Sequence, residues 1–422
     1  MSQFIFEGYD YHPDTGEATF RYRYDDGRRF VEAVTFSPSA DYNPDALERA
    51  LFLAHLVIGT SYFKTFPTQE VKIETGAIDT RQAAFLNLVF QEGLSQFAFE
   101  NQLTRSDLAQ FVPTGDTPLR AVTYEGEGVL ALQSGGKDSL LVAALLKKSG
   151  TVFSPWYVSS SDHHPAVLDE LGAPLVTARR TLDKGALQQA LEDGGKNGHV
   201  PVTYIVQSLA LIQAILRGNN EILVSIAHEG EEPHAMIGDL SVTHQWSKTW
   251  AAEQLFADYV SEYISADIRI GSPLRQFSEL RVAELFIKYA WSDFGQRFSS
   301  CNRANYTQGA NNTELHWCGE CPKCANSYLL FAPFLDANVL KDLFAGQDLF
   351  EKEMLQETFK GLLGVGGVMK PFECVGEIDE LRYAYGLAQD KGGYGRVSFD
   401  VPRATFDYKA AYPAQKWAKL PL

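Results

Sequence analysis

Residues 132–139, with the sequence Leu-Gln-Ser-Gly-Gly-Lys-Asp-Ser, constrain the fold of this chain more than any other segment. They follow an apolar run at 128–132 and open an amphipathic run at 138–148, so the pattern predicts a strand, a tight turn and a helix. The glycines let the backbone approach an anion closely, and Ser134, Ser139 and the first helical N–H groups can donate hydrogen bonds to it. We therefore predict a phosphate-binding turn.

Two known phosphate turns compete for this segment. The P-loop pattern GxxxxGK[ST] does not fit, because Ala131 replaces its first glycine and Asp138 follows Lys137 where Ser or Thr is required. The string 134–139 instead resembles the PP-loop of ATP pyrophosphatases, SGGxDS, which cleave ATP into AMP and pyrophosphate. The alternative is an ordinary glycine turn in a doubly wound sheet.

Apolar strands and helical segments alternate after residue 121. The expected strands are 128–133, 152–159, 174–178, 221–227 and 267–270, and the expected helices are 138–148, a short one after Pro165, 202–216 and 247–264. This alternation predicts an α/β fold with a doubly wound, mostly parallel sheet over 121–297, which we expect to be of PP-loop type. Ligands bind such sheets at the carboxyl ends of the strands, where the phosphate turn lies, as do 159–164, 226–229 and 271–275.

The regions on either side of this sheet carry less visible chemistry. Three aromatic-rich segments, 4–11, 18–24 and 30–36, predict a meander, and helices are expected from Asn43 to Gly59 and from Asp79, which gives an α+β domain over 1–120. Residues 337–422 are predicted to form a helical tail with segments 338–363 and 377–389. The first domain could contact substrate, although its tyrosines are more often core residues.

Four of the five cysteines are clustered between 298 and 336. Cys301, Cys318, Cys321 and Cys324 have the close spacing of a zinc knuckle, in which four thiolates surround Zn2+. We expect a structural zinc site, and the alternative is a set of reduced thiols without metal.

Composition limits the classes of partner. The chain has 53 acidic and 37 basic residues and a net charge of -16, which disfavours binding to nucleic acid. It shows neither a signal peptide nor an apolar run long enough to span a membrane. We expect a cytoplasmic protein that acts on a small molecule and leave its oligomeric state open.

Several further strings resemble one family across nearly the whole chain. They are Asn197-Gly-His199-Val-Pro-Val-Thr203, His244-Gln-Trp-Ser-Lys248, Pro273-Leu-Arg275-Gln-Phe-Ser-Glu279, Ser300-Cys-Asn-Arg303, Trp317-Cys-Gly-Glu-Cys-Pro-Lys-Cys324 and Lys370-Pro-Phe-Glu-Cys-Val-Gly-Glu377. Together they are similar to the UDP-N-acetylmuramoyl-L-alanyl-L-glutamate epimerases of peptidoglycan synthesis. Thr243 stands where that pattern has Asn, and 226–230 departs from it, so the resemblance assigns no role to Glu229.

The resemblance implies ATP-dependent inversion of the terminal L-Glu of UDP-MurNAc-L-Ala-L-Glu through an acyl adenylate. Ser134, Gly135, Gly136, Lys137, Asp138 and Ser139 would then hold ATP, with Lys137 offsetting developing charge and Asp138 placing Mg2+. The runner-up is a zinc-containing PP-loop ligase like 7-cyano-7-deazaguanine synthase, which has a similar knuckle. A nucleotide-binding sensor without activity is the third possibility.

The groups that move the Cα proton are the least constrained. Candidates are Cys374, which lies outside the cysteine cluster, and His199 and His244; each could instead be a packing residue. Lys248 is a further candidate active-site residue that could bind a substrate carboxylate or diphosphate, or could be only a surface charge or an ion-pair member. Arg275, Glu279 and Glu373 are candidates for substrate binding, although Glu279 could simply pair with Arg281 on a helix face.

Overall fold

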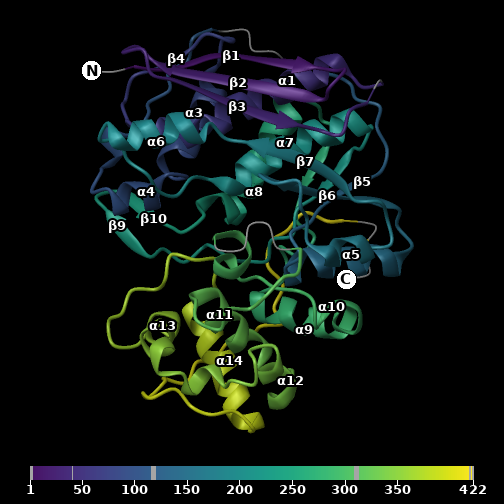
Figure 1. Cartoon of the computed structure of the whole chain (residues 1–422), viewed down its shortest axis with the longest axis vertical. Helices are drawn as coiled ribbons and strands as arrows, with labels where there is room; N and C mark the ends of the chain where they lie inside the picture. Colours follow the sequence, from purple (N-terminus) through teal and green to yellow (C-terminus); the bar gives the residue numbers. More distant parts are fainter. Residues whose placement is uncertain (1–2, 40, 116–119, 308–312, 418–419, 421–422) are drawn as a thin grey trace.

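The structure is a computed structural model that describes residues 3–39, 41–115, 120–307, 313–417 and 420. Within this part of the chain, nine strands form one sheet in the order β11-β8-β5-β6-β7-β3-β2-β1-β4 (Figure 1). The strands of this sheet are β1 (Phe4–His12), β2 (Glu17–Tyr24), β3 (Arg29–Thr35), β4 (Val71–Ile73), β5 (Val129–Leu132), β6 (Phe153–Ser159), β7 (Val176–Thr181), β8 (Glu221–Leu223) and β11 (Arg269–Gly271). A separate hairpin, β9 (Ala235–Ile237) and β10 (Leu240–Val242), was not expected from the sequence.

The helices of the described residues follow most of the expected pattern. Their bounds are α1 (Pro44–Ile58), α2 (Thr60–Phe63), α3 (Thr80–Gln91), α4 (Ser95–Glu100), α5 (Lys137–Ser149), α6 (Lys184–Glu192), α7 (Val202–Arg217), α8 (Trp250–Tyr263), α9 (Glu279–Tyr289), α10 (Trp291–Phe294), α11 (Pro322–Phe331), α12 (Ala337–Asp342), α13 (Gln356–Leu362) and α14 (Ile378–Lys391). Asn43 caps α1 and Asp79 caps α3 through their side chains, as the sequence predicts. None of these helices is long and apolar enough to cross a membrane.

Both faces of the parallel strands are covered. Along β5, Leu130 belongs to a core shared with α1, α3, α7 and α8, whereas Val129 and Ala131 belong to a core shared with α5, α9, α11 and α14. Trp156 and Tyr157 of β6 divide in the same way, because successive side chains of a strand point to opposite faces. The prediction of a mostly parallel sheet with helices on both faces is therefore confirmed.

The strand order reverses at β5. From β5 the chain proceeds through β6 to β7 on one side, and then returns to β8 and β11 on the other, with parallel pairing throughout. Such a switch point leaves a crevice outside the carboxyl ends of its strands.

The N-terminal meander is continuous with the parallel strands. The sequence places it in a domain over 1–120, and in the structure β3 pairs antiparallel with β7. A buried ion pair crosses this junction, since Nε of Arg180 donates to Oε1 of Glu32 at 2.6 Å and the hydroxyl of Tyr62 donates to Glu32 at 2.9 Å. The pairing of β3 with β7 thus joins the N-terminal meander and the parallel strands into one sheet, and the ion pair links the two at this junction.

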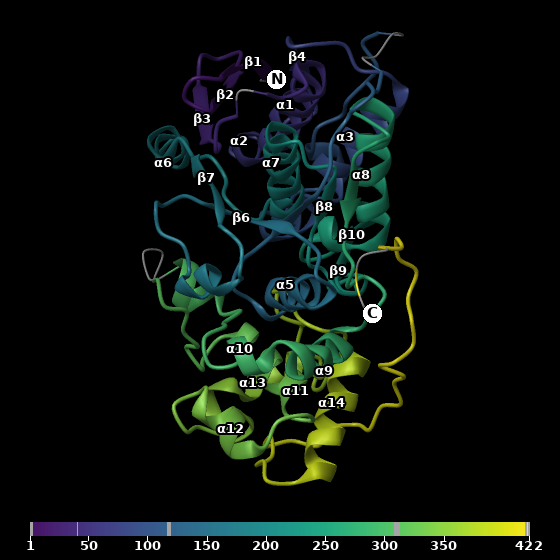
Figure 2. The ribbon, with the colours of Figure 1, turned by 90° about the vertical axis from the view of Figure 1, so that its right-hand side faces the viewer.

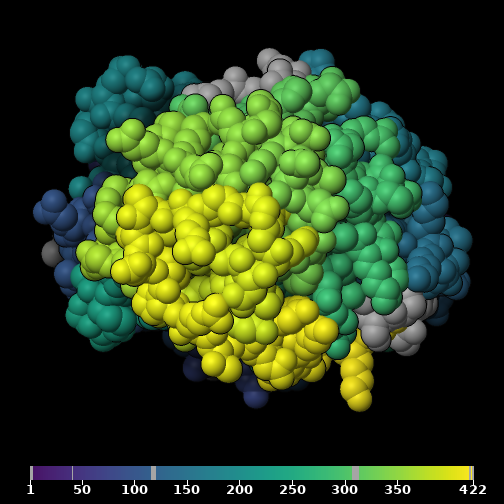
Figure 3. Space-filling view, turned by 90° about the horizontal axis from the view of Figure 1, so that it is seen from below, coloured from purple at the N-terminus to yellow at the C-terminus, as the bar shows by residue number. Residues whose placement is uncertain are grey.

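The C-terminal helices form the end of the molecule opposite the meander (Figure 1) and cover the face seen in Figure 3. The helix expected over 338–363 is interrupted between α12 and α13, because Ala345 and Gly346 have φ of 55° and 78°. The helix expected over 247–264 also begins later, since 246–248 form a 3-10 turn and Thr249 caps α8. The final segment runs back along the edge of the sheet (Figure 2), where the N–H of Tyr412 donates to the carbonyl of Gln276.

Candidate active site

A cavity of about 430 Å³ lies at the switch point. Its lining comes from the carboxyl ends of β5, β6 and β8, from the start of α7, and from segments beside the cysteine cluster. The lining residues used below are Ser134, Gly136, Asp138, Ser139, Lys248, Ser299, Asn302, Tyr306, Lys323 and Cys374. The structure thus gathers residues from distant parts of the sequence, between 132 and 374, around one cavity.

The turn between β5 and α5 forms the floor of this cavity. Gly135 has a φ of 77°, a left-handed conformation that favours glycine, and an added Cβ would lie 2.5 Å from Leu315. Gly136 is the N-cap of α5 and contributes no side chain to cap it, while the hydroxyl of Ser139 accepts from the N–H of Ser134 at 3.2 Å. The predicted strand, turn and helix are therefore confirmed, and the positive end of the α5 dipole faces the cavity.

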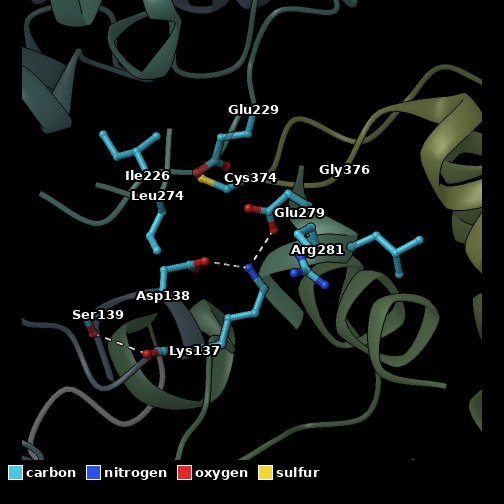
Figure 4. Close-up of polar contacts among 12 residues, drawn as sticks. Lys137, Asp138, Ser139, Ile226, Glu229, Leu274, Glu279, Arg281, Cys374 and Gly376 are labelled. Carbon is cyan, nitrogen blue, oxygen red and sulfur yellow. Dashed lines mark hydrogen bonds and ion pairs between the residues drawn. The ribbon is translucent and has the colours of Figure 1, made fainter. Parts of the chain in front are cut away.

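Lys137 joins this turn to α9. Its Nζ donates to Oδ1 of Asp138 at 2.8 Å and to Oε2 of Glu279 at 2.7 Å, and the side chains of Lys137 and Glu279 are both buried (Figure 4). Burial alone would lower the pKa of Lys137, but the two carboxylates raise it above its ordinary value. Burial and the charges of Asp138 and Glu229 raise the pKa of Glu279. Glu279 therefore positions a cation beside the phosphate turn and does not pair with Arg281, which pairs with Glu284.

A second group of charges lies at the same cavity, where Lys248 and Cys374 belong to the lining and Glu229 is buried beside Lys248. Nζ of Lys248 lies 3.4 Å from Oε1 of Glu229, and the side chain of Cys374 points toward Glu229 in Figure 4. Burial alone would lower the pKa of Lys248, but Cys374 and Glu229 raise it. Burial alone would raise the pKa of Glu229, whereas Lys248 and Lys323 bring it below its ordinary value. At neutral pH this group thus contains a lysine cation and a carboxylate beside a thiol.

The two histidines predicted as proton-transfer candidates lie beside each other. The rings of His199 and His244 are 4.9 Å apart, and Nδ1 of His244 donates to Oε1 of Gln96 at 2.6 Å. Burial and nearby lysines lower the pKa of His199 to about 4, and burial and His199 lower that of His244 to about 2. Both rings are therefore neutral at pH 7 and can accept a proton only weakly. The buried Nε2 of His199 has no hydrogen-bond partner among the described residues.

Arg275 is fully buried and held by the protein itself. Its Nε donates to Glu253 at 3.0 Å, and its two terminal nitrogens donate to the carbonyls of Ala227 and Lys248 at 2.8 Å each. These contacts fix the backbone at Lys248 and at Ala227, two residues before Glu229. The structure thus places Arg275 behind the cavity wall, as a support for the residues that line it.

Glu373 directly precedes Cys374, which lines the cavity. Its Oε2 accepts from Nδ2 of Asn302 at 3.1 Å, and burial raises its pKa. A largely buried carboxyl group therefore adjoins the predicted base in the chain and is held by Asn302, which lines the cavity.

The four clustered cysteines come together as the spacing predicts. Their sulfur atoms all lie within 4.8 Å of one another, with Cys301–Cys321, Cys318–Cys324 and Cys321–Cys324 separations of 3.6, 3.7 and 3.5 Å. A tetrahedral ion with Zn–S bonds of about 2.3 Å needs sulfurs about 3.8 Å apart. The set is free of disulfides and could hold a metal ion such as zinc.

Two residues of the cavity lining, Asn302 and Lys323, were not singled out from the sequence, where they were visible only as neighbours of cysteines. Glu229 belongs to the segment 226–229, which the strand pattern places at this edge of the sheet without giving the residue a role. No local pattern separates a lysine that lines a cavity from one in solvent. Only the folded chain shows that the cysteine segments form a cavity wall.

Comparisons with known proteins match both halves of the chain. A family model described as the MurL N-terminal domain matches residues 1–272, and one described as the MurL C-terminal domain matches residues 297–399. The UDP-N-acetyl-alpha-D-muramoyl-L-alanyl-L-glutamate epimerase of Xanthomonas oryzae pv. oryzae is 35% identical over 377 residues, which cover 88% of this chain and 82% of that protein. The epimerase of the same name from Salinispora tropica is 32% identical over 403 residues, covering 93% and 86%. This chain belongs to the MurL epimerase family.

Proposed function

We propose that the chain inverts the terminal L-Glu of UDP-MurNAc-L-Ala-L-Glu to D-Glu, consuming ATP and releasing AMP and pyrophosphate, as a step of peptidoglycan precursor synthesis. The observation that carries this proposal is the junction of two groups in one cavity. Asp138 of the phosphate turn lines this cavity and pairs with Lys137 and through it with Glu279, which suits activation of an acid. Lys248, which pairs with Glu229, and Cys374 line the same cavity, which suits movement of a proton. The names and the coverage of the relatives supply the substrate.

Activation of the α-carboxylate of the terminal glutamate makes its Cα proton easier to remove. A free α-carboxylate strongly opposes removal of the adjacent Cα proton, because the resulting carbanion would carry a second negative charge beside it. Attack of a carboxylate oxygen on the α-phosphorus of ATP forms an acyl phosphate bond and expels pyrophosphate with the electrons of the broken P–O bond. The mixed anhydride removes the carboxylate charge, so the Cα proton can leave and an enolate can form.

The phosphate turn would bind the nucleotide in this step. N–H groups at the start of α5, with Ser134 and Ser139, would hold the triphosphate, and the Lys137 ammonium would offset charge developing on the leaving pyrophosphate. Asp138 is the residue that would hold Mg2+, an ion that shields phosphate charge when bound. With these roles the sheet would be of the PP-loop type.

Cys374 is the proposed base for the Cα proton. Lys248 lines the same cavity as Cys374, and Glu229, 3.4 Å from the Lys248 ammonium, holds this cation in place. His199 and His244 are neutral and would act as hydrogen-bond partners or as a weak second acid/base. Return of a proton to the opposite face, followed by hydrolysis of the anhydride, gives the D-product and AMP.

Zinc is the proposed metal of the Cys301, Cys318, Cys321 and Cys324 cluster. When bound it would cross-link the loop at 301 to the start of α11. All four donors are thiolates, which leaves no coordination position for a water or substrate, so its role is structural.

One assay tests the activity and separates it from the runner-up. The protein is incubated with ATP, Mg2+ and UDP-MurNAc-L-Ala-L-Glu, and the configuration of the glutamate in the product and the amount of pyrophosphate are measured with and without ammonia. D-Glu formed without ammonia supports the epimerase. The second candidate is a ligase that forms an amide or nitrile, and the observation on its side is the cluster of four cysteines beside the phosphate turn. A ligase of this kind would release pyrophosphate only when ammonia is present and would leave L-Glu unchanged.

A further inference from the structure

Residues 373–376, which carry Cys374 along the cavity wall, are held by side chains of the cysteine cluster. Nδ2 of Asn302 donates to the carboxylate of Glu373 at 3.1 Å, Nζ of Lys323 donates to the carbonyl of Cys374, and the N–H of Gly376 donates to Oδ1 of Asn326 at 3.0 Å. In the sequence, Asn302 adjoins Cys301, Lys323 lies between Cys321 and Cys324, and Asn326 follows two residues later. Residues in and beside the cysteine cluster thus form hydrogen bonds with Glu373, Cys374 and Gly376 of this segment.

The same cluster reaches the phosphate turn on its other side. The hydroxyl of Tyr306 donates to the carbonyl of Ser134 at 2.9 Å, and the N–H of Ser299 donates to the carbonyl of Gly135 at 3.3 Å. Asn302, Tyr306 and Lys323 also line the cavity. A loop ordered by metal would therefore set the distance between the nucleotide turn and Cys374.

Lys323 is the contact that acts on Cys374 itself. It stands in the first turn of α11, inside the pair of closely spaced cysteines, so a bound metal would fix its backbone. A lysine outside the cluster offers a comparison, because Nζ of Lys352 donates to the carbonyl of Gly319 at 2.9 Å and lies 3.7 Å from Glu320, two residues that lie between the cysteines. Lys352 therefore supports the cluster without touching residues 373–376.

We propose that Lys323 is a positioning residue for proton transfer, which couples the metal-ordered turn at Cys321–Cys324 to the placement of Cys374 by holding its carbonyl. The inference rests on the proposed function for the reaction that Cys374 serves. The contact itself can be tested without turnover.

The test compares Lys323→Met with Lys352→Met in the full chain. Hydrogen-exchange mass spectrometry follows peptides over 371–378, elemental analysis gives bound zinc, ATP–pyrophosphate exchange reports activation, and deuterium uptake at Cα reports proton transfer. We expect Lys323→Met to keep its zinc, to raise amide exchange over 371–378 about tenfold, and to lower Cα deuterium uptake at saturating substrate about 100-fold. ATP–pyrophosphate exchange should change by less than about threefold in the same variant. Lys323→Arg should recover part of the loss, since its guanidinium can still donate to a carbonyl, and Lys352→Met should match wild type in Cα uptake.

Two outcomes would overturn the proposal. Lys323→Met could match wild type in both amide exchange and Cα uptake, or it could lose zinc and loosen the whole cluster, which would make Lys323 a purely structural part of the metal site. If that variant does not fold, Asn326→Ala removes the contact to Gly376, and unchanged exchange over 371–378 there would refute the coupling. Absence of Cα uptake in wild type would refute the proposed function alone, because the amide-exchange comparison still decides the contact.

Discussion

Replacement of Glu380 by Gln should change how the stability of this protein depends on pH. Glu380 belongs to α14 and is 1% exposed, and its Oε1 accepts from the N–H of Leu280 at 2.7 Å at the start of α9. Burial, with the neighbouring charge of Glu279, raises its pKa to about 8. This carboxyl group therefore accepts from the first turn of the helix that carries Glu279, while its burial favours the protonated form over the charged one.

The direction and the size of this pH effect follow from the difference between the pKa of Glu380 in the folded chain and in the unfolded chain. Because the pKa of Glu380 is higher in the folded chain than in the unfolded one, the folded state binds more protons, and this stabilisation is present at low pH and lost as pH rises toward 8. At about 1.4 kcal/mol per pH unit, the loss between pH 5 and pH 7 is about 3 kcal/mol. Glutamine resembles the protonated acid and keeps the acceptor for Leu280, so Glu380→Gln should be more stable than wild type by about this amount near pH 7 and nearly equal to it at pH 5.

Urea denaturation of wild type and Glu380→Gln at pH 5, 6, 7 and 8 measures this difference. Glu357→Gln is the matched control, since the side chain of Glu357 is 70% exposed, and we expect it to leave the pH dependence unchanged. A free energy of unfolding that changes with pH in parallel for wild type and Glu380→Gln would refute the reasoning.

Further predictions concern the two halves of the cavity and its supports. Asp138→Ala should reduce ATP–pyrophosphate exchange by about 1,000-fold or more without unfolding the chain, and exchange near the wild-type rate would remove Asp138 from nucleotide binding. Cys374→Ser should abolish deuterium uptake at Cα while pyrophosphate exchange persists; retention of both would discard the thiol as base. Arg275→Met leaves Glu253 buried without its partner, so urea denaturation should show a loss of about 3–5 kcal/mol, and a loss below about 1 kcal/mol would contradict the support role. Elemental analysis should find about one zinc per wild-type chain and little in Cys318→Ser, whereas metal-free wild type would contradict the knuckle.

Local sequence patterns were sufficient to predict those helix starts, turns and ligand sets that depend on contacts between residues close in the sequence. Asn43 and Asp79 bond within their own first helical turns, and the glycine pair after β5 forms a turn that an extra Cβ would obstruct, so each could be recognised from a few residues. The cysteine cluster was predictable for the same reason, because the spacing of its close ligands matches the geometry of one ion.

The other features of the fold and of the cavity depend on contacts between residues that are far apart in the sequence, so local patterns did not predict them. Nothing near β3 indicates that it will pair with β7, or that Glu32 will meet Arg180 at a separation of 148 residues. Arg275 looked like a substrate ligand in sequence, and only the fold shows that all of its nitrogens are used by Glu253 and two carbonyls. The grip of Lys323 on Cys374 spans 51 residues and has no local signature either.

The most direct test of the central claim is deuterium uptake at Cα of the terminal glutamate, measured in deuterated water with ATP, without nucleotide, and with an ATP analogue whose α–β bridge cannot be cleaved. The account predicts uptake with inversion only when ATP is cleaved to AMP and pyrophosphate, because the carboxylate must lose its charge before the Cα proton can leave. Uptake at the same rate without ATP or with the analogue would contradict activation through an acyl adenylate.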